Sequence, residues 1–430
     1  MSFKISQGVL THYIEEPGVT VVRIPDDVRV IRWKTFVHCR KLEALWIPAK
    51  TEKIESGAFI GCVNLKKIVV DKRNKNYFTR KGVLYQYEDS HVLGYQLFFC
   101  PAGIRKLHIP ALVNGIDRKA FSDSINLEKI TVSLLNRNYI MKDGLLCTYD
   151  MQEIIRCPVN QKKAILSHSI QEIEMFAFAD CKELEEIEFS ANLATIWDSA
   201  FQNCTALKEI HLPSGVTVVG ESAFEGCTCL KEMIFPAGAW RIGFNALADC
   251  TSLEKVTLPE NLSYRTQIFL KCHELKTIVW RNAELNLPRI FREEFERRRT
   301  GFFYYFRVNE LIQFLMCEER ERFNKNKRLT YSATLELFFS NLADKQKEKA
   351  FIESHFMDTI KYLIDENQPE RIKMLMESMN SCFNNDNTQE FIMYANEKQK
   401  YEIQVMLMDY KARHFGNESQ EEIIRRKFEL

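Results

Sequence analysis

A short pattern recurs with a constant spacing along the first two thirds of this 430-residue chain, and no other feature restricts its fold as strongly. Each copy reads Phe-x-x-Cys-x-x-Leu-x-x-Ile, with small departures. A fixed period of about 20 to 29 residues is typical of chains in which one short supersecondary unit per copy stacks on its neighbours and shares their core. We find eight copies, anchored at Phe36, Phe59, Phe121, Phe178, Phe201, Phe224, Leu247 and Phe269.

Two longer steps interrupt the period. The step from Phe36 to Phe59 recurs unchanged from Phe178 as far as Leu247, and the last step, to Phe269, is shorter by one position. The steps that end and begin at Phe121 are more than twice as long. Each long interval contains a turn dipeptide, Lys81-Gly82 or Asp143-Gly144, that precedes an apolar run. Such a dipeptide is typical of a β-hairpin, so we expect a hairpin insertion in each interval.

The end of each copy alternates between apolar and polar residues as a β-strand does. In the copy from Leu207 to Pro213, we expect Ile210 and Leu212 to point into the core and Glu209 and His211 to point outward. The proline then ends the strand because it has no N–H to donate to the ladder. Stacked copies therefore place one column of side chains inside the solenoid and another on its surface.

The combined pattern Ala-Phe-x-x-Cys-x-x-Leu-x-x-Ile-x-Leu-Pro, over about residues 20–283, resembles the BspA-like leucine-rich repeat. The resemblance implies a right-handed solenoid with a strand on one side and a short turn or irregular helix on the other. It also implies a role in protein recognition and not in catalysis. Ser124 departs from the family pattern by replacing the cysteine, and Leu247 departs by replacing the phenylalanine.

After residue 283 the period vanishes and the spacing of apolar residues becomes helical. Pro369 suits the first turn of one helix, and we expect Asn387 and Glu390 to form a capping box for another. Two runs have apolar residues on one helical face: Leu335, Phe338, Phe339 and Leu342, and then Ile372, Leu375, Met376 and Met379.

The predicted fold class is therefore α+β, a leucine-rich repeat β-solenoid of about eight coils followed by an all-α domain. We place an N-terminal capping hairpin at residues 1–19, the solenoid at 20–283 and the α-helical domain at 284–430. Residues 363–376 resemble residues 394–407 at an offset of 31, near the ankyrin period of about 33. The helical part thus resembles the degenerate ankyrin-like tail that follows such solenoids in some bacterial proteins, although the Thr-Pro-Leu-His signature is absent.

Seven of the 13 cysteines share one position of the repeat. Cysteine is small and is among the residue types most often buried, so we interpret the seven as a ladder packed inside the solenoid. Metal binding would need clustered pairs, and the sequence offers only Cys227-Thr228-Cys229 beside nine scattered histidines. We therefore expect no metal and no cofactor. The seven ladder residues are Cys39, Cys62, Cys181, Cys204, Cys227, Cys250 and Cys272.

Charge and hydropathy exclude several functional classes. The net charge is +1, so no global field would recruit nucleic acid or an anionic membrane. No stretch approaches the roughly 18 apolar residues that span a bilayer, and the first residues lack the apolar core of a signal peptide. We expect a cytoplasmic protein, or an extracellular one if a leader has been removed. A secreted or surface adhesin is the alternative function.

Two further alternatives rest on the helical part. Some bacterial effectors join leucine-rich repeats to a ubiquitin-ligase domain with a nucleophilic cysteine. Only Cys317 and Cys382 are available here, and neither has the Cys-x-Asp motif of that family. The arginines and aromatic residues of 297–307 have the composition of a single-strand binding surface, but three glutamates precede them and favour a solvated helix end with an aromatic docking seam. We predict neither catalysis nor nucleic-acid binding.

The best candidate for a binding site is the outward column of the strands, which takes one residue from each copy. Four of its eight members are apolar, and aligned exposed apolar residues often mark interfaces. The alternatives are that β-branched residues simply suit strands, or that the helical tail or a hairpin covers them. Besides Glu188 and Thr257, the column contains the residues that we predict to contact a protein partner of unknown identity: Trp46, Val69, Thr131, His211, Ile234 and Val279.

Overall fold

The computed structural model describes residues 2–88, 94–260, 262, 267–287, 308, 311, 327–340 and 345–416. These residues fall into two compact units. The first takes the described residues through Arg281, together with Val308 and Leu311, and the second begins at Asn282.

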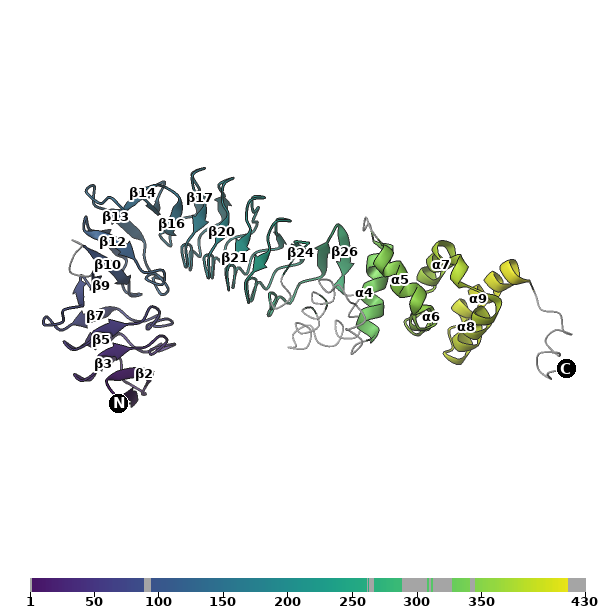
Figure 1. Ribbon diagram of the computed structural model, residues 1–430, viewed down its shortest axis with the longest axis horizontal. Helices are drawn as coiled ribbons and strands as arrows, with labels where there is room; N and C mark the ends of the chain where they lie inside the picture. Colours follow the sequence, from purple (N-terminus) through teal and green to yellow (C-terminus); the bar gives the residue numbers. More distant parts are fainter. Residues whose placement is uncertain are drawn as a thin grey trace. The chain divides into compact units, whose positions relative to one another are not determined.

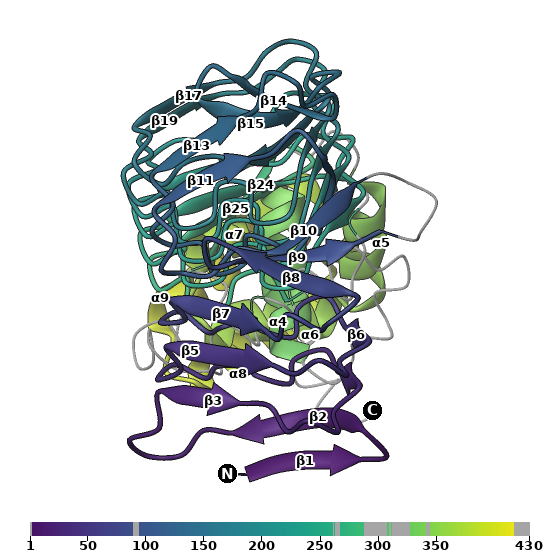
Figure 2. The same ribbon diagram turned by 90° about the vertical axis from the view of Figure 1, so that its left-hand side faces the viewer.

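The first unit is a β-solenoid, as predicted, and its first stack of strands is parallel. Successive strands of this stack run in the same direction, which Figure 2 shows for the first three. Between the seventh and eighth strands of the stack, one coil contributes only an isolated bridge from His211 to Ile234. The strands are β3 (Val21–Arg23), β5 (Ala44–Ile47), β7 (Lys67–Val70), β11 (Lys106–Ile109), β13 (Lys129–Val132), β17 (Lys163–Ile165), β19 (Glu186–Glu188), β22 (Glu232–Ile234), β24 (Lys255–Leu258) and β25 (Thr277–Trp280).

The solenoid has about eleven coils, so the count of eight from the sequence was too low. The coils of β3, β11 and β17 were missed because each lacks the phenylalanine anchor. Tyr13, Cys100 and Cys157 occupy that position instead. The backbone N–H of each donates to the carbonyl just before the next anchor, at 3.0, 2.8 and 2.7 Å respectively, as the N–H of Phe178 does at 2.7 Å. A different side chain therefore fills the same place in the same backbone arrangement.

A second stack of strands lines the other side of the coils, and the two expected hairpins occur within it. The last strand of each hairpin segment, β10 or β16, pairs in parallel with the next coil. The hairpins are thus part of the ladder and do not project from it. In chain order the strands are β1 (Ser2–Ser6), β2 (Val9–Ile14), β4 (Val30–Ile31), β6 (Lys53–Ile54), β8 (Tyr77–Arg80), β9 (Val83–Tyr87), β10 (Tyr95–Phe99), β12 (Val113–Ile116), β14 (Tyr139–Lys142), β15 (Leu145–Thr148), β16 (Glu153–Arg156), β18 (Glu172–Ile173), β20 (Thr195–Ile196), β21 (Val218–Val219) and β23 (Arg241–Ile242).

A buried asparagine joins each hairpin to the coil before it. The Asn74 amide donates to the carbonyls of Pro48 and Thr51 at 2.8 and 3.0 Å, and its oxygen accepts from two backbone N–H groups. Asn136, at the equivalent point before the second hairpin, donates to Pro110 and Val113 at 2.7 and 2.9 Å and accepts in the same way. These bonds satisfy backbone groups that would otherwise be left unpaired where the parallel stack is interrupted.

Stacked phenylalanine rings form the core of the later coils. The ring of Phe201 lies 4.9 Å from that of Phe178 and 5.1 Å from that of Phe224, with planes within 8° of parallel. All three side chains are fully buried. Because successive coils repeat the same backbone, each ring meets the same neighbour above and below, and the coils follow one another in chain order along the solenoid (Figure 1).

The second unit contains strand β26 (Ala283–Asn286) and, among its described residues, six α-helices. Predicted helix residues Leu335 and Phe338 are buried in α4, and Ile372 and Leu375 in α7, whereas Leu342 lies outside the described residues. The elements are α4 (Lys327–Phe339), α5 (Gln346–Ser354), α6 (Phe356–Asp365), α7 (Pro369–Ser378), the 3-10 turn η2 (Asn380–Cys382), α8 (Asn385–Glu397) and α9 (Tyr401–Phe415).

The helix ends confirm one expectation and correct another. Pro369 begins α7, as predicted. The capping box of α8 uses Asn384 as the cap and Asn387 as its partner, so the prediction placed it one turn too late. Asn384 is the N-cap because its backbone is extended, which lets its side chain accept a hydrogen bond from the N–H of Asn387 at 2.8 Å.

The turn that connects α6 to α7 has the same backbone hydrogen-bond pattern as the turn that connects α8 to α9. In the first, the N–H groups of Glu366 and Gln368 donate to Tyr362 and Leu363 at 3.0 Å each; the second repeats these bonds from Lys398 and Lys400 at 3.0 and 2.8 Å. Lys398 thus corresponds to Glu366, so the offset between the two turns is one position longer than the sequence comparison indicated. The ankyrin-like character of this region stays a prediction.

Candidate protein-binding surface on the outward strand ladder

The register of the first stack aligns its outward side chains in one column, which we call the outward ladder. Trp46 pairs with Val69, Ile234 with Thr257, and Thr257 with Val279. The structure adds one residue from each coil that the sequence pattern missed. The outward ladder from coil 1 to coil 11 is Arg23, Trp46, Val69, His108, Thr131, Ile165, Glu188, His211, Ile234, Thr257 and Val279.

The six predicted contact residues thus lie on one face, but their exposure differs. Thr131, His211 and Ile234 are exposed, and Ile234 keeps 45% of its surface accessible. Trp46, Val69 and Val279 are half-buried. The role of this face in binding stays a prediction.

Neighbouring polar side chains explain part of this difference. The Arg23 guanidinium lies over the Trp46 ring, 4.9 Å from its centroid, and an arginine at this distance attracts the ring electrostatically. The His108 ring contacts the Thr131 hydroxyl at 3.0 Å. The ladder therefore mixes apolar side chains with polar groups that can form hydrogen bonds.

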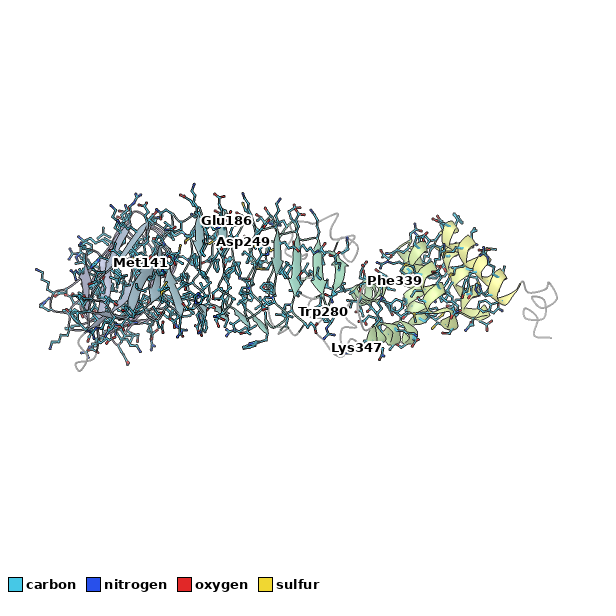
Figure 3. All side chains as sticks on the ribbon, turned by 90° about the horizontal axis from the view of Figure 1, so that it is seen from above. Met141, Glu186, Asp249, Trp280, Phe339 and Lys347 are labelled. Carbon is cyan, nitrogen blue, oxygen red and sulfur yellow. The ribbon has the colours of Figure 1, made fainter. Side chains whose placement is uncertain are left out.

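A second outward column, two residues before the outward ladder, changes the sign of its charge along the solenoid. We call its part in coils 4 to 9 the charge column; the same strand position holds Lys67 in coil 3 and Lys255 in coil 10. Its basic half comes from coils 4 to 6 and its acidic half from coils 7 to 9, and every member is exposed, including Glu186, which is labelled in Figure 3. Its six members in coil order are Lys106, Lys129, Lys163, Glu186, Glu209 and Glu232.

The two halves of the charge column meet at an ion pair. The Lys163 ammonium lies 3.1 Å from Glu186 and 2.8 Å from Glu188, and both contacts raise its pKa. Away from this junction the charges are alike on adjacent coils, because Lys106 pairs in register with Lys129. Within the ranges that the structure describes, neither of these two lysines forms an ion pair.

The inward cysteines form the predicted buried ladder. All seven are at most 2% exposed. The Cys227 thiol donates to the Phe201 carbonyl of the preceding coil at 3.3 Å, and those of Cys204 and Cys250 make the same bond at 3.1 and 3.2 Å. Burial raises the pKa of Cys227 to about 12. Burial likewise raises the pKa of Cys204 and of Cys250, which favours the neutral thiol, whereas a side-chain hydrogen bond with Cys157 lowers the pKa of Cys181.

The other cysteine predictions have different outcomes. Cys227 is buried while Cys229 is exposed, so the two do not form a paired metal site. Cys382 is partly buried, and burial raises its pKa, which disfavours the thiolate that a ubiquitin-ligase mechanism would need. Cys317 and segment 297–307 lie outside the described residues.

One acidic cluster occurs among the described residues. Single carboxylate oxygens of Glu153, Glu172 and Glu174 lie within 4.8 Å of one another. The Trp197 indole N–H donates to Glu172 at 2.7 Å, and Arg118 lies 3.8 Å from Glu174. Burial raises the pKa of Glu174, and that of Glu153 is raised by burial and by the neighbouring carboxylates. The indole of Trp197, the guanidinium of Arg118 and the protonation that the raised pKa values favour together stabilise the three neighbouring carboxyl groups without a bound ligand.

None of the helices in the described ranges combines the length and apolar character needed to cross a membrane.

Comparison with known proteins gives a family match. The sequence matches the model described as "BspA type Leucine rich repeat region", in six copies, over residues 13–83, 91–148 and 155–276, which is more than half of the chain. No curated protein matches.

Similar solved structures come from bacterial leucine-rich repeat proteins. A protein from Eubacterium ventriosum is 19% identical with a TM-score of 0.42, over 64% of this chain and 81% of its own. The pneumococcal vaccine antigen PcpA is 21% identical with a TM-score of 0.42, over 63% and 71%. A leucine-rich cell surface protein from Faecalibacterium prausnitzii is 23% identical with a TM-score of 0.40, over 61% and 79%.

Proposed function

Because the chain belongs to the BspA-type leucine-rich repeat family, we propose that it is a non-enzymatic scaffold that binds a protein partner through the outward ladder of its solenoid. The family match supports an interaction or surface repeat protein, and no catalytic family is indicated. The described thiols also favour a scaffold over a cysteine nucleophile, since burial raises the pKa of Cys382 and of Cys227.

One observation carries the proposal: the outward ladder varies from coil to coil, whereas the inward position is cysteine in seven coils and serine in an eighth. The outward ladder runs through arginine, tryptophan, valine, histidine, threonine, isoleucine and glutamate, although each side chain occupies the same place on the same strand. Strand formation alone needs no such variety, because β-branched residues would serve every coil. Recognition of a shaped partner does need it, since specificity comes from different contacts at different positions.

The exposed apolar members make this face suitable for a protein. Ile165 and Ile234 keep 52% and 45% of their surfaces accessible, at positions three coils apart. Apolar side chains between charged ones resemble the composition of protein interfaces, in which an apolar centre has a polar rim.

A site-specific cross-linking experiment tests the proposal. The full chain would carry p-benzoylphenylalanine in place of Val69 or Thr131 on the outward ladder, or in place of Lys53 on β6 of the second stack as the control. We expect covalent adducts with one protein from the source cells at the first two positions and none at Lys53. The identified partner would then be purified and its affinity measured by calorimetry.

The matched variant combines Trp46→Ala with Ile234→Asp. We expect partner affinity to fall at least about ten-fold, because interface anchors typically contribute more than about 1 kcal/mol each, while thermal unfolding stays nearly unchanged. Equal adducts at Lys53, or unchanged affinity in the folded double variant, would contradict the proposal.

A further inference from the structure

The charge column gives the outward face a pattern that is complementary to itself. Over coils 4 to 9 it reads lysine in three successive coils and glutamate in the next three, with Lys67 in coil 3 and Lys255 in coil 10 on either side. A two-fold axis parallel to the strands, lying in the plane between the two faces and passing between coils 6 and 7, would bring coil 5 of one copy opposite coil 8 of the other. Lys129 would then face Glu209, and Lys106 would face Glu232. We infer that this face pairs with the same face of a second copy of this chain, antiparallel, about that axis.

This inference rests on the proposed function, because it names the partner of the same outward ladder. The two-fold arrangement is isologous, so every contact occurs twice and each copy offers the same patch. The central pair, Lys163 with Glu186, is already formed within one chain at 3.1 Å. The contacts made by the second copy are therefore those of the four outer members of the charge column.

Three of those four outer members lack the neutralising neighbour on the next coil that the central pair has, whereas Glu232 pairs in register with Lys255. Lys106 and Lys129 stand side by side in register, and like charges on adjacent strands repel. Glu209 lies 3.8 Å from the imidazole of His211, and in the described parts of the chain no lysine or arginine forms an ion pair with it or with Glu232. Opposite charges from a second copy would relieve both repulsions together.

The ends of the outward ladder agree with the same axis. Coil 2 would meet coil 11, so Trp46 would face Val279, and coil 3 would meet coil 10, so Val69 would face Thr257. All four are half-buried and none is charged. The strand position of the charge column does not match beyond its six members, since Lys67 would face Lys255. The complementarity thus has a charged centre of six coils and uncharged members of the outward ladder beyond it.

The size of the face limits the strength of the pairing. Ten overlapping coils at about 4.8 Å each, with strands about 13 Å long, give roughly 600 Å² per copy. A stable interface usually buries about 800 Å² per partner, so we expect a weak dimer whose formation depends on charge. Such a dimer should dissociate as salt is raised, because exposed ion pairs are screened.

A second copy fits these observations better than an acidic protein or an anionic membrane. Either of those would satisfy the lysines of coils 4 to 6 and would be repelled by the glutamates of coils 7 to 9. A second copy satisfies both halves with one contact.

Sedimentation equilibrium of the full chain tests the inference. We expect a monomer–dimer equilibrium at about 20 mM salt that shifts to monomer at about 500 mM. One variant combines Lys106→Glu with Lys129→Glu, and a second combines Glu209→Lys with Glu232→Lys. Each should weaken its own dimer at least about ten-fold, since it sets like charges against each other at four places. Their equimolar mixture should restore the dimer, because each basic face then meets an acidic one.

A control variant changes the same number of charges on the second stack, with Lys53→Glu on β6 and Arg241→Glu on β23, and should dimerise like the parent chain. A cross-link gives a second measurement that does not depend on the charge variants. Benzoylphenylalanine at Thr131 should link to the region of His211 in the second copy, whereas links between the two Thr131 regions would place the axis elsewhere.

A chain that is monomeric at low salt would overturn the inference, as would a mixture of the folded variants that fails to restore the dimer. The inference would also be overturned if the parent chain dimerised only when phosphatidylserine vesicles were present, because the basic half of the charge column would then bind a membrane. None of these results would contradict the proposed function. Cross-linking of the outward ladder to a different protein would still support it.

Discussion

The inward and outward ladders of the solenoid occupy equivalent places on successive coils, yet their sequences differ in kind. In the eight coils that carry the repeat pattern, the inward ladder is cysteine seven times and Ser124 once, and every member is buried. The coils of Tyr13, Cys100 and Cys157 lack it. The outward ladder has seven residue types over eleven coils, never the same one in adjacent coils, and is partly or fully exposed. In seven of those eight coils the inward side chain donates to the anchor carbonyl of the preceding coil, so one small residue type suits them. The outward position is free of that constraint, so its variation can serve recognition.

Removing one ring of the core should have the largest effect. Phe201→Ala takes away a fully buried side chain stacked between Phe178 and Phe224, and such truncations cost about 3–5 kcal/mol. The free energy of unfolding, measured with urea, checks this. Phe244→Ala is the control, because Phe244 is 47% exposed, and it should change stability far less. A similar loss of stability in both variants would mean that the stacked phenylalanine rings contribute no more to stability than an exposed ring does.

The coil with the serine exception has a second departure, which should make stability depend on pH. Burial raises the pKa of Asp123 to about 6, although the Gly61 N–H and the Ser122 hydroxyl donate to its carboxylate. A folded pKa above the unfolded value of about 3.9 means that folding favours the protonated acid. The stability due to this group is therefore present below about pH 4 and is lost as pH rises through about 6.

Asp123→Asn should remove this dependence, because the amide is neutral: its oxygen can accept from the Gly61 N–H, and its NH2 group can donate to the Ser122 hydroxyl oxygen. We expect a gain of about 1–3 kcal/mol at pH 7 and little change at pH 4. Urea unfolding at the two pH values gives the comparison. A loss of stability at pH 7 would show that the ionised carboxylate is needed in this coil.

Replacing one inward thiol should cost less than removing a ring. In Cys227→Ser the hydroxyl can still donate to the Phe201 carbonyl, as the Ser124 hydroxyl donates to Cys100 at 2.9 Å, and the expected loss is about 1 kcal/mol for burying a more polar group. Cys229→Ser, at an exposed position, should have no effect on unfolding. A cost of several kcal/mol at Cys227 would point to a role for sulfur beyond packing.

The smallest effect is expected on the outward ladder. Ile234→Thr keeps a β-branched residue on the strand and should change the free energy of unfolding by less than about 0.5 kcal/mol. Met233→Thr, at the adjacent buried position, should cost much more. If the two substitutions cost the same, the outward face is covered within the chain and is not available to a partner.

Sequence reasoning found the solenoid, its hairpins and the inward ladder, because a short period repeats the same local signals in every coil. It missed three coils in which Tyr13, Cys100 and Cys157 replace phenylalanine, although spacing offered a signal: each of these residues precedes the next anchor by one period or slightly less. It consequently missed Arg23, His108 and Ile165 in the outward ladder. The charge column was visible in the sequence only after all coils had been aligned, since its basic half includes two of the missed strands.

The sequence by itself determined that the coils stack and which side chains point inward, because every copy carries the same alternation of apolar and polar residues. Only the tertiary structure decided how the stack continues through the two hairpin segments, where Asn74 and Asn136 bind carbonyl groups of the preceding coil. It also placed Arg156 in the core, fully buried, with its guanidinium donating to the carbonyls of Phe176 and Ser124. A local pattern fixes what each coil must bury, whereas hydrogen bonds across an interruption depend on which coils meet on its two sides.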